Sequence, residues 1–171
     1  MNNTNVPKLT TIYTIGHSNH TDEAFLALLQ QHAIGCLVDV RSQPYSRYNP
    51  QFNRETLIKS LQTAGIHYLH MGDTLGGRPE QRDLYDAGET RPNYSRQRQT
   101  ELYQQGLHQL IKLVQQTTVA IMCSEGNPHE CHRQWLITPD LLDSDITVLH
   151  IHPNGNLETA EKTLEQLGFG F

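Results

Sequence analysis

Cysteine, long apolar runs and glycine-rich motifs are all scarce in this sequence, and each absence excludes a class of protein. The three cysteines, Cys36, Cys123 and Cys131, are too few to build a disulfide scaffold. No apolar run approaches the roughly 18 residues that a membrane span requires. Residues 1–11 are polar and lack the apolar core of a secretory signal. The glycine-rich fingerprint of dinucleotide-binding proteins is also missing. We therefore expect a cytoplasmic protein with no membrane partner.

Charged residues are few and unevenly distributed. They make up 18% of the 171 residues, against a usual ~25%. The net charge of −5 argues against a general polyanion binder. Eight of the nine arginines nevertheless lie between Arg41 and Arg98, together with most of the tyrosines. Arginine binds anions and tyrosine stacks on bases, so this stretch predicts an anion or nucleic-acid surface. The alternative is an ordinary solvated surface of arginine–acid pairs.

Short apolar runs alternate with amphipathic segments along the chain. The pattern predicts strands at 12–16, 36–40, 66–69, 119–122 and 147–151, and helices at 21–32, 53–65, 95–114, 130–137 and 157–167. Residues 70–94 show little periodicity and predict a long loop, of the kind that is often functional or mobile. We expect a flexible segment at 1–10 and, at 11–171, a single Rossmann-like α/β domain. Its three layers would be a mostly parallel central sheet of about five strands with helices on both faces.

Polar residues gather where the predicted strands end. Ligands of such folds bind beyond the carboxyl ends of the strands. Backbone N–H groups and a hydroxyl after the first strand suit a phosphate, and an acid ending the second suits a ribose, a metal, a catalytic water or a turn cap. An arginine near the start of a helix needs an anionic partner, either Asp39 or the ligand. The predicted substrate-binding residues are His17, Ser18, Asn19, Asp39, Arg41, Ser42, Arg47, Tyr48 and Arg133.

The segment from Cys123 to Arg133, with the sequence CSEGNPHECHR, is the strongest chemical signal. It runs from a predicted strand end into a predicted helix start. A helix N-terminus lowers the pKa of a nearby thiol, which makes Cys123 a candidate nucleophile. His129 or His132 would act as its base, and Glu125 as a general acid or base. The predicted catalytic residues are Cys123, Glu125 and His132.

The same segment has a metal interpretation and a purely structural one. Cys123, His129, Cys131 and His132 offer two thiolates and two imidazoles, a set that suits zinc. Adjacent residues of a regular helix point about 100° apart, which argues against chelation by Cys131 and His132 together. No cofactor is therefore predicted, with zinc as the alternative. In the structural interpretation Cys123 is a small apolar residue that packs at a strand end.

Several motifs in a fixed order resemble a bacterial and archaeal family that is catalogued as domain of unknown function 488. They are TIGHSN at 14–19, VDVRSxPxS at 38–46, LGG at 75–77 and CxExxPxxCHR at 123–133. The resemblance covers about residues 11–155. It implies an α/β domain and a shared site built from these loops, and it implies no activity.

A second, architectural analogy is to rhodanese-type sulfurtransferases, in which a cysteine loop also follows a strand. The chain departs from that pattern because Pro128 stands where the rhodanese loop usually has an arginine. Glu125 would also repel an anion held in the loop. His129 occupies the position at which a cysteine phosphatase needs its arginine. The analogy therefore extends to architecture at most.

These observations favour an enzyme of the hydrolase or transferase type that acts on a small anionic or nucleotide-like substrate. In that hypothesis Arg41, Arg47 and Arg133 bind the anion, and His17 or His132 relays protons. The alternative is a non-catalytic module that binds nucleotides or nucleic acid through loops 41–98. A further alternative is a metal-binding protein. A homodimer is the commonest assembly for such proteins.

Overall fold

A six-stranded sheet forms the centre of the computed structural model, which describes residues 10–162. The strand order is β3-β2-β4-β1-β5-β6. All neighbouring strands run parallel except β5 and β6, which pair antiparallel. The mostly parallel sheet that the sequence predicts is confirmed. The strands are β1 (Thr11–Gly16), β2 (Cys36–Asp39), β3 (His67–His70), β4 (Val119–Cys123), β5 (Thr147–Ile151) and β6 (Leu157–Thr159).

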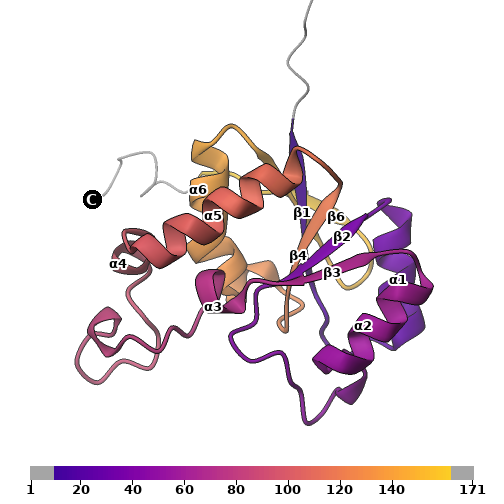
Figure 1. Ribbon diagram of the computed structural model, residues 1–171, viewed down its shortest axis with the longest axis horizontal. Helices are drawn as coiled ribbons and strands as arrows, with labels where there is room; N and C mark the ends of the chain where they lie inside the picture. Colours follow the sequence, from indigo (N-terminus) through magenta and orange to yellow (C-terminus); the bar gives the residue numbers. More distant parts are fainter. Residues whose placement is uncertain (1–9, 163–171) are drawn as a thin grey trace, which may run out of the picture.

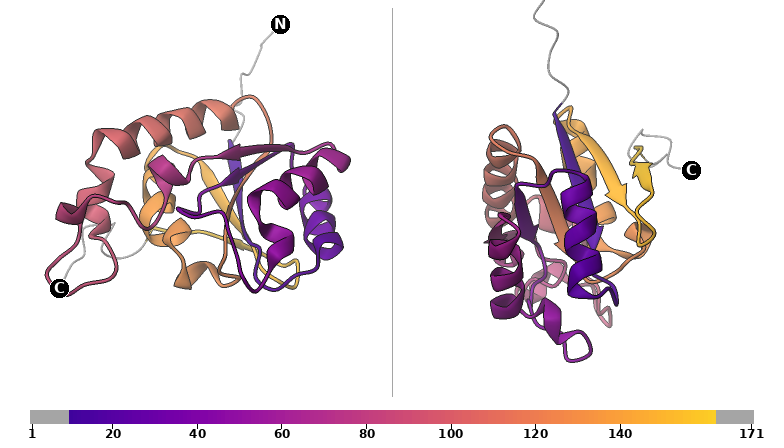
Figure 2. Two further views of the ribbon diagram at one scale, coloured as in Figure 1. Left: turned by 60° about the horizontal axis from the view of Figure 1, so that its bottom comes forward. Right: turned by 90° about the vertical axis from the view of Figure 1, so that its right-hand side faces the viewer.

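Helices cover both faces of the sheet, as predicted. Figure 1 shows α1 (Asp22–Gln31) and α2 (Arg54–Thr63) together on one side of the strands. On the other side lie α3 (Gly72–Leu75), α4 (Tyr94–Arg98), α5 (Glu101–Val114) and α6 (Thr138–Asp143). In the left view of Figure 2, α5 extends along one edge of the molecule, and α1 and α2 lie side by side at the opposite end. No helix within residues 10–162 is long and apolar enough to cross a membrane.

The sheet separates two apolar cores. Successive side chains of a strand point to opposite faces, so Leu37 joins the core under α1 and α2 while Val38 joins the core under α5. All five residues of β4 are buried, which is the pattern of a central strand covered on both faces. The two cores therefore fix β4 in the middle of the protein.

The chain order places a crevice at the carboxyl end of β4. The connections that follow β1 and β2 lead into α1 and α2 on one face of the sheet. The connection that follows β4 leads to α6 on the other face. Neighbouring strands whose connections diverge in this way leave an open crevice at their carboxyl ends, the usual ligand position of such folds. Because β4 lies between β1 and β2, its last residue, Cys123, lies at this crevice.

Two of the predicted helices are wrong. The predicted helix 157–167 begins as the short strand β6, which raises the number of strands from five to six; residues 163–167 lie outside the described part of the chain. The predicted helix 95–114 is two helices, α4 and α5. Thr100 separates them, because its side chain accepts a hydrogen bond from the backbone N–H of Tyr103 and so caps the start of α5.

Two further segments differ from the prediction in detail. The expected helix at 130–137 is a 3-10 turn, η3 (Pro128–Glu130), followed by a π-helical turn, η4 (Arg133–Ile137). The predicted loop 70–94 contains α3 and the 3-10 turn η2 (Arg82–Leu84). The segment between α3 and α4 extends away from the sheet in Figure 1.

The burial of α5 predicts the effect of two matched substitutions on stability. Leu110 is fully buried in the core under α5, whereas Leu102 in the same helix is 40% exposed. We expect Leu110→Ala to lower the free energy of unfolding by about 2–5 kcal/mol, because it removes buried methyl groups and leaves a cavity. Leu102→Ala should cost less than about 1 kcal/mol. Urea unfolding of both variants checks this, and equal losses would contradict the assigned packing of α5.

Candidate functional site

A cavity of about 800 Å³ opens at the carboxyl ends of β2 and β4. One wall is the segment after β4, with Cys123, Glu125, Cys131 and His132. The segments after β2 and after β3 supply most of the opposite wall. The loops after β2, β3 and β4 therefore meet in one place.

Two thiols and one imidazole meet in this cavity. The Sγ atom of Cys123 lies 3.5 Å from His132 Nδ1, and the Sγ atom of Cys131 lies 3.8 Å from the same nitrogen. Cys123 also donates its S–H to Glu125 Oε2 over 3.0 Å. Both thiols are almost completely buried, at 6% and 3% exposure, whereas Glu125 is exposed. The predicted catalytic residues are therefore assembled, and Cys131 is added to them.

Arg133 lies directly behind this cluster and has no access to solvent. Its Nε donates to Cys131 Sγ over 3.1 Å, and one Nη donates to the backbone carbonyl of Glu125 over 2.6 Å. Within residues 10–162 no carboxylate lies at ion-pair distance from it, so neither Asp39 nor any other acid is the partner that the sequence predicted. An unpaired charge is very costly to bury. The sulfur of Cys131 is therefore the counter-charge of Arg133.

The two thiols have opposite protonation preferences. The neighbouring Cys123 sulfur, a contact with His132 and the Arg133 cation lower the pKa of Cys131. The neighbouring Cys131 sulfur, burial and the nearby Glu125 raise the pKa of Cys123. These directions contradict the low thiol pKa predicted for Cys123 and favour Cys131 as the thiolate. The backbone N–H of Arg133 faces Cys131 Sγ at 3.5 Å, so Cys131 occupies the favourable place at the helix start.

A buried chain of hydrogen bonds holds Arg133 in place. A guanidinium only donates, so its contact with Thr14 Oγ1 at 3.2 Å makes the hydroxyl an acceptor. The hydroxyl proton of Thr14 then points to His150 Nδ1, 2.7 Å away. His150 is consequently neutral and donates from Nε2 to Gln134 Oε1 over 2.8 Å. This chain links β1, β5 and η4 behind the reactive cluster.

Two glycines allow the cavity walls to approach. A Cβ atom on Gly16 would collide with the backbone carbonyl of Glu125, so only glycine lets the loop after β4 lie against the end of β1. A Cβ on Gly77 would come within 2.7 Å of the His132 ring. The Nε2 atom of His132 is buried and has no partner among residues 10–162. The ring position is therefore set by the two sulfurs and by Gly77.

Asp39 and Arg41 form a separate buried network. The two side chains make a bidentate ion pair with distances of 2.9 and 2.7 Å. Asp39 also accepts from the backbone N–H of Arg41, which is the turn cap that the sequence allowed, and from the hydroxyl of Tyr68. Asp39 is fully buried. Its role is to anchor the loop after β2. Arg41 also lines the cavity, and its Nη1 has no hydrogen-bond partner among residues 10–162.

The remaining predicted binding residues are spread around the crevice. Ser42 lines the cavity and accepts a hydrogen bond from the backbone N–H of Arg78. The segment His17, Ser18 and Asn19 does not line it; His17 is buried against Phe52. Arg47 and Tyr48 are exposed outside the cavity. The arginine set Arg41, Arg47 and Arg133 therefore does not converge on one anion.

The cavity wall also contains residues that the sequence marked only as part of the arginine- and tyrosine-rich stretch. They are Arg78, Arg91 and Tyr94, of which the first two are exposed. The guanidinium of Arg91 lies 5.4 Å from the ring centre of Tyr94. Burial raises the pKa of Tyr94 to about 12, so its phenol stays neutral. These residues lie in a segment without periodicity, and nothing in the sequence separates them from the other arginines and tyrosines nearby.

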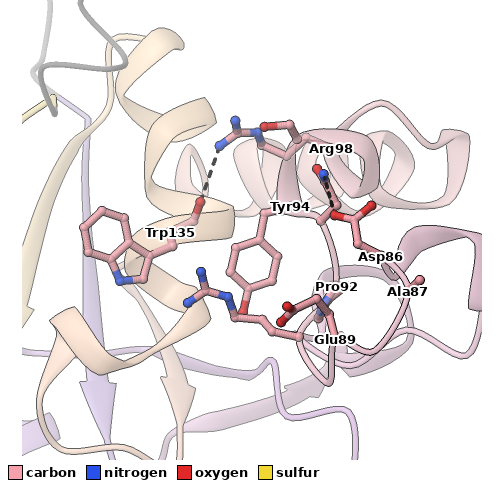
Figure 3. Close-up of a pocket in the computed structure, with 10 residues that line it drawn as sticks. Asp86, Ala87, Glu89, Pro92, Tyr94, Arg98 and Trp135 are labelled. Atoms are coloured by element: carbon pink, nitrogen blue, oxygen red, sulfur yellow. Dashed lines mark hydrogen bonds between the residues drawn. The ribbon is translucent and has the colours of Figure 1, made fainter. Parts of the chain in front are cut away.

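A second cavity of about 680 Å³ adjoins the first and shares Arg91 and Tyr94 with it. Figure 3 shows Tyr94 near its centre and Arg98 extended toward Trp135. Arg98 donates to the backbone carbonyl of Trp135 over 3.4 Å. This cavity contains no cysteine or histidine, so the reactive groups belong to the first cavity.

Three of the four predicted zinc ligands lie together, and the fourth does not. The ligand atoms of Cys123, Cys131 and His132 all lie within 4.8 Å of one another. His129 instead contacts Glu158 at 2.7 Å and lies apart from the cluster. The objection to adjacent ligands does not hold, because Cys131 is extended and only His132 has helical backbone angles.

Some residues of the predicted nucleic-acid surface are exposed and others are paired with acids. Tyr45 and Tyr48 are 70% and 89% exposed. Arg41 is buried with Asp39, and Arg96 pairs with Asp86. Nucleic-acid binding stays a prediction.

The comparison with known proteins identifies a family but does not indicate an activity. Residues 21–138, more than half of the chain, match the model of a family described as "Domain of unknown function DUF488". No curated protein and no solved structure matches the chain. The matched range includes every member of the thiol cluster.

The buried histidines predict how stability depends on pH. Burial lowers the pKa of both His17 and His150 to about 4, and the neighbouring Arg133 contributes at His150. An unfolded histidine takes up a proton near pH 6.5, so below that pH the unfolded state binds more protons and the fold loses stability. Between pH 7 and pH 4.5 we expect a loss of roughly 2–3 kcal/mol for each histidine.

Urea unfolding at the two pH values measures this loss. His150→Gln should remove the part of the pH dependence that His150 contributes. The exposed control His129→Ala should leave that contribution unchanged. An unchanged pH dependence in His150→Gln would contradict the neutral, buried state of His150.

Proposed function

The chain belongs to the family described as domain of unknown function 488, and we propose that it is an enzyme that transfers or hydrolyses a group on a small anionic substrate. The observation that carries the proposal is the convergence of Cys123, Cys131 and His132, with Glu125 beside them, in a cavity of about 800 Å³. Ligand pockets of enzymes commonly have this size and a few convergent polar groups.

The cluster has the parts that acyl, phosphoryl or related group transfer needs. Cys131 is buried and accepts a hydrogen bond from Arg133, which favours its thiolate, and His132 contacts both sulfurs. Glu125 is exposed and lies within 3.0 Å of Cys123, where it can accept and return a proton. Groups with perturbed pKa values in a cavity are typical of catalytic centres.

The cavity walls suggest the substrate class. Within residues 10–162, Arg78 and Arg91 have no carboxylate partner, so both are available to an anion. The neutral phenol of Tyr94 can donate a hydrogen bond beside them. The cavity also contains the acids Asp73, Glu80 and Glu130. Such mixed charge favours a small substrate with one anionic group over a polyanion.

Activity can be tested with nitrophenyl esters of acetate, phosphate and sulfate. We expect measurable hydrolysis of at least one of them. Glu125→Gln and Cys131→Ser should each lower kcat/KM by about 100-fold or more, the usual effect of losing a general acid–base group. The buried Cys36, which lies outside the cavity, provides the control Cys36→Ser with wild-type kcat/KM. Hydrolysis that is absent, or unchanged in both site variants, would contradict an enzymatic role for the cluster.

The wall residues provide a separate prediction on substrate binding. Arg91→Ala should raise KM for an anionic ester about tenfold with little change in kcat, because it removes one charged hydrogen bond. Arg82→Ala is the matched control, since Arg82 is an exposed arginine on the same segment outside the cavity. An equal KM in the two variants would show that Arg91 does not contact the substrate.

A further inference from the structure

The two sulfur–nitrogen distances of the thiol cluster match those around one zinc ion. With typical zinc bond lengths, tetrahedral coordination places a sulfur and a nitrogen about 3.6 Å apart and two sulfurs about 3.8 Å apart. The two sulfur–nitrogen distances here are 3.5 Å and 3.8 Å, and all three ligand atoms lie within 4.8 Å of one another. Coordination would require only small movements of these side chains.

We propose that Cys123, Cys131 and His132 bind one zinc ion, an inference that rests on the proposed function because the ion would supply its nucleophile. Two thiolates and an imidazole are soft and borderline ligands, which select zinc over magnesium or calcium. Three protein ligands with an open fourth position are the pattern of catalytic zinc. All three residues line the cavity, so an ion held between them would be next to the substrate space.

The local backbone explains how neighbouring residues can bind one ion. Cys131 has φ −127° and ψ 148°, an extended conformation, whereas His132 has φ −62° and ψ −18°. Because the chain turns between the two residues, the Cys131 thiol and the His132 ring converge. Cys123 lies beside them at the end of β4. The hydrogen bond from Arg133 to the backbone carbonyl of Glu125 holds the loop between Cys123 and Cys131 in place.

The surroundings supply the outer contacts and the charge balance of such a site. Arg133 donates to Cys131 Sγ, and hydrogen bonds of this kind orient metal ligands. A bound zinc ion deprotonates a coordinating thiol, so Cys123 would join Cys131 as a thiolate. Zinc with two thiolates is then neutral, and the charges of Arg133 and Glu125 balance each other.

Zinc at this position gives a complete hydrolytic step. A zinc-bound water has a pKa near ~7, and Glu125 accepts its proton. The resulting hydroxide forms a bond to the electrophilic atom of the substrate. The bond to the leaving group breaks with its electron pair, and Glu125 returns the proton to that group. Water is the only co-reactant, and no electrons are gained or lost.

Metal binding can be measured directly on the full chain. The protein is treated with chelator and reductant, titrated with zinc chloride against a chromogenic chelator, and its metal content is measured by elemental mass spectrometry. We expect one zinc ion per chain. Cys123→Ser, Cys131→Ser and His132→Ala should each weaken binding by about 100-fold or more, the upper range for disturbed metal sites. Cys36→Ser and His129→Ala, matched controls in residue type, should bind like the wild type.

Cobalt provides a second readout that does not depend on activity. A cobalt-loaded protein should show thiolate-to-metal absorption that weakens in each single cysteine variant and vanishes in Cys123→Ser/Cys131→Ser. Circular dichroism of each metal-free variant separates lost binding from lost folding. Sub-stoichiometric zinc in the wild type, or equal losses in the Cys36 and His129 controls, would overturn the zinc site.

The outcomes for the metal and for the enzyme are distinguishable. If zinc does not bind but Glu125→Gln and Cys131→Ser still lose ester hydrolysis, the zinc site fails and the enzyme proposal stands on the thiolate. If zinc binds with the expected ligands but no ester is hydrolysed, the zinc site stands and the enzyme proposal fails.

Discussion

The buried charge of Arg133 is the constraint on which the site depends. A guanidinium without solvent needs a negative partner and a hydrogen bond for each of its donors. Its partners are Thr14 on β1, the backbone carbonyl of Glu125 and the sulfur of Cys131. One side chain thus ties the central sheet to both ends of the reactive loop. It also fixes which of the two thiols carries the negative charge.

The fold determines where Arg133 and the reactive loop lie. Because β4 is central and covered on both faces, the segment that leaves it starts from a rigid position. The connections after β1 and β2 diverge to the other face, so the crevice beside Cys123 stays open. A second ion pair, between Asp39 and Arg41, anchors the facing loop without entering the reactive cluster. The architecture therefore separates the groups that hold the site from those that face its cavity.

Periodicity and motif position were enough to predict the layers, the mostly parallel sheet and the segment that carries the cluster. They could not predict β6, because a three-residue edge strand has no period of its own. They also could not show that Arg133 turns inward to Cys131, since a π-helical turn rotates side chains away from their regular positions. The assignment of the thiolate to Cys123 was wrong for the same reason. The conformation of the loop between 123 and 133 determines which sulfur Arg133 contacts. That conformation depends on tertiary packing, which the sequence pattern does not reveal.

The most direct test is the protonation state of Cys131 in metal-free protein. Thiolate ultraviolet absorbance is followed against pH in Cys123→Ser, which leaves the contacts of Cys131 with His132 and Arg133 in place. The same titration of Cys123→Ser/Cys131→Ser provides the baseline and removes the contribution of Cys36. The account predicts that the difference between the two already shows a full thiolate at pH 6. A difference that develops only near pH ~8.5, the ordinary range for cysteine, would contradict it.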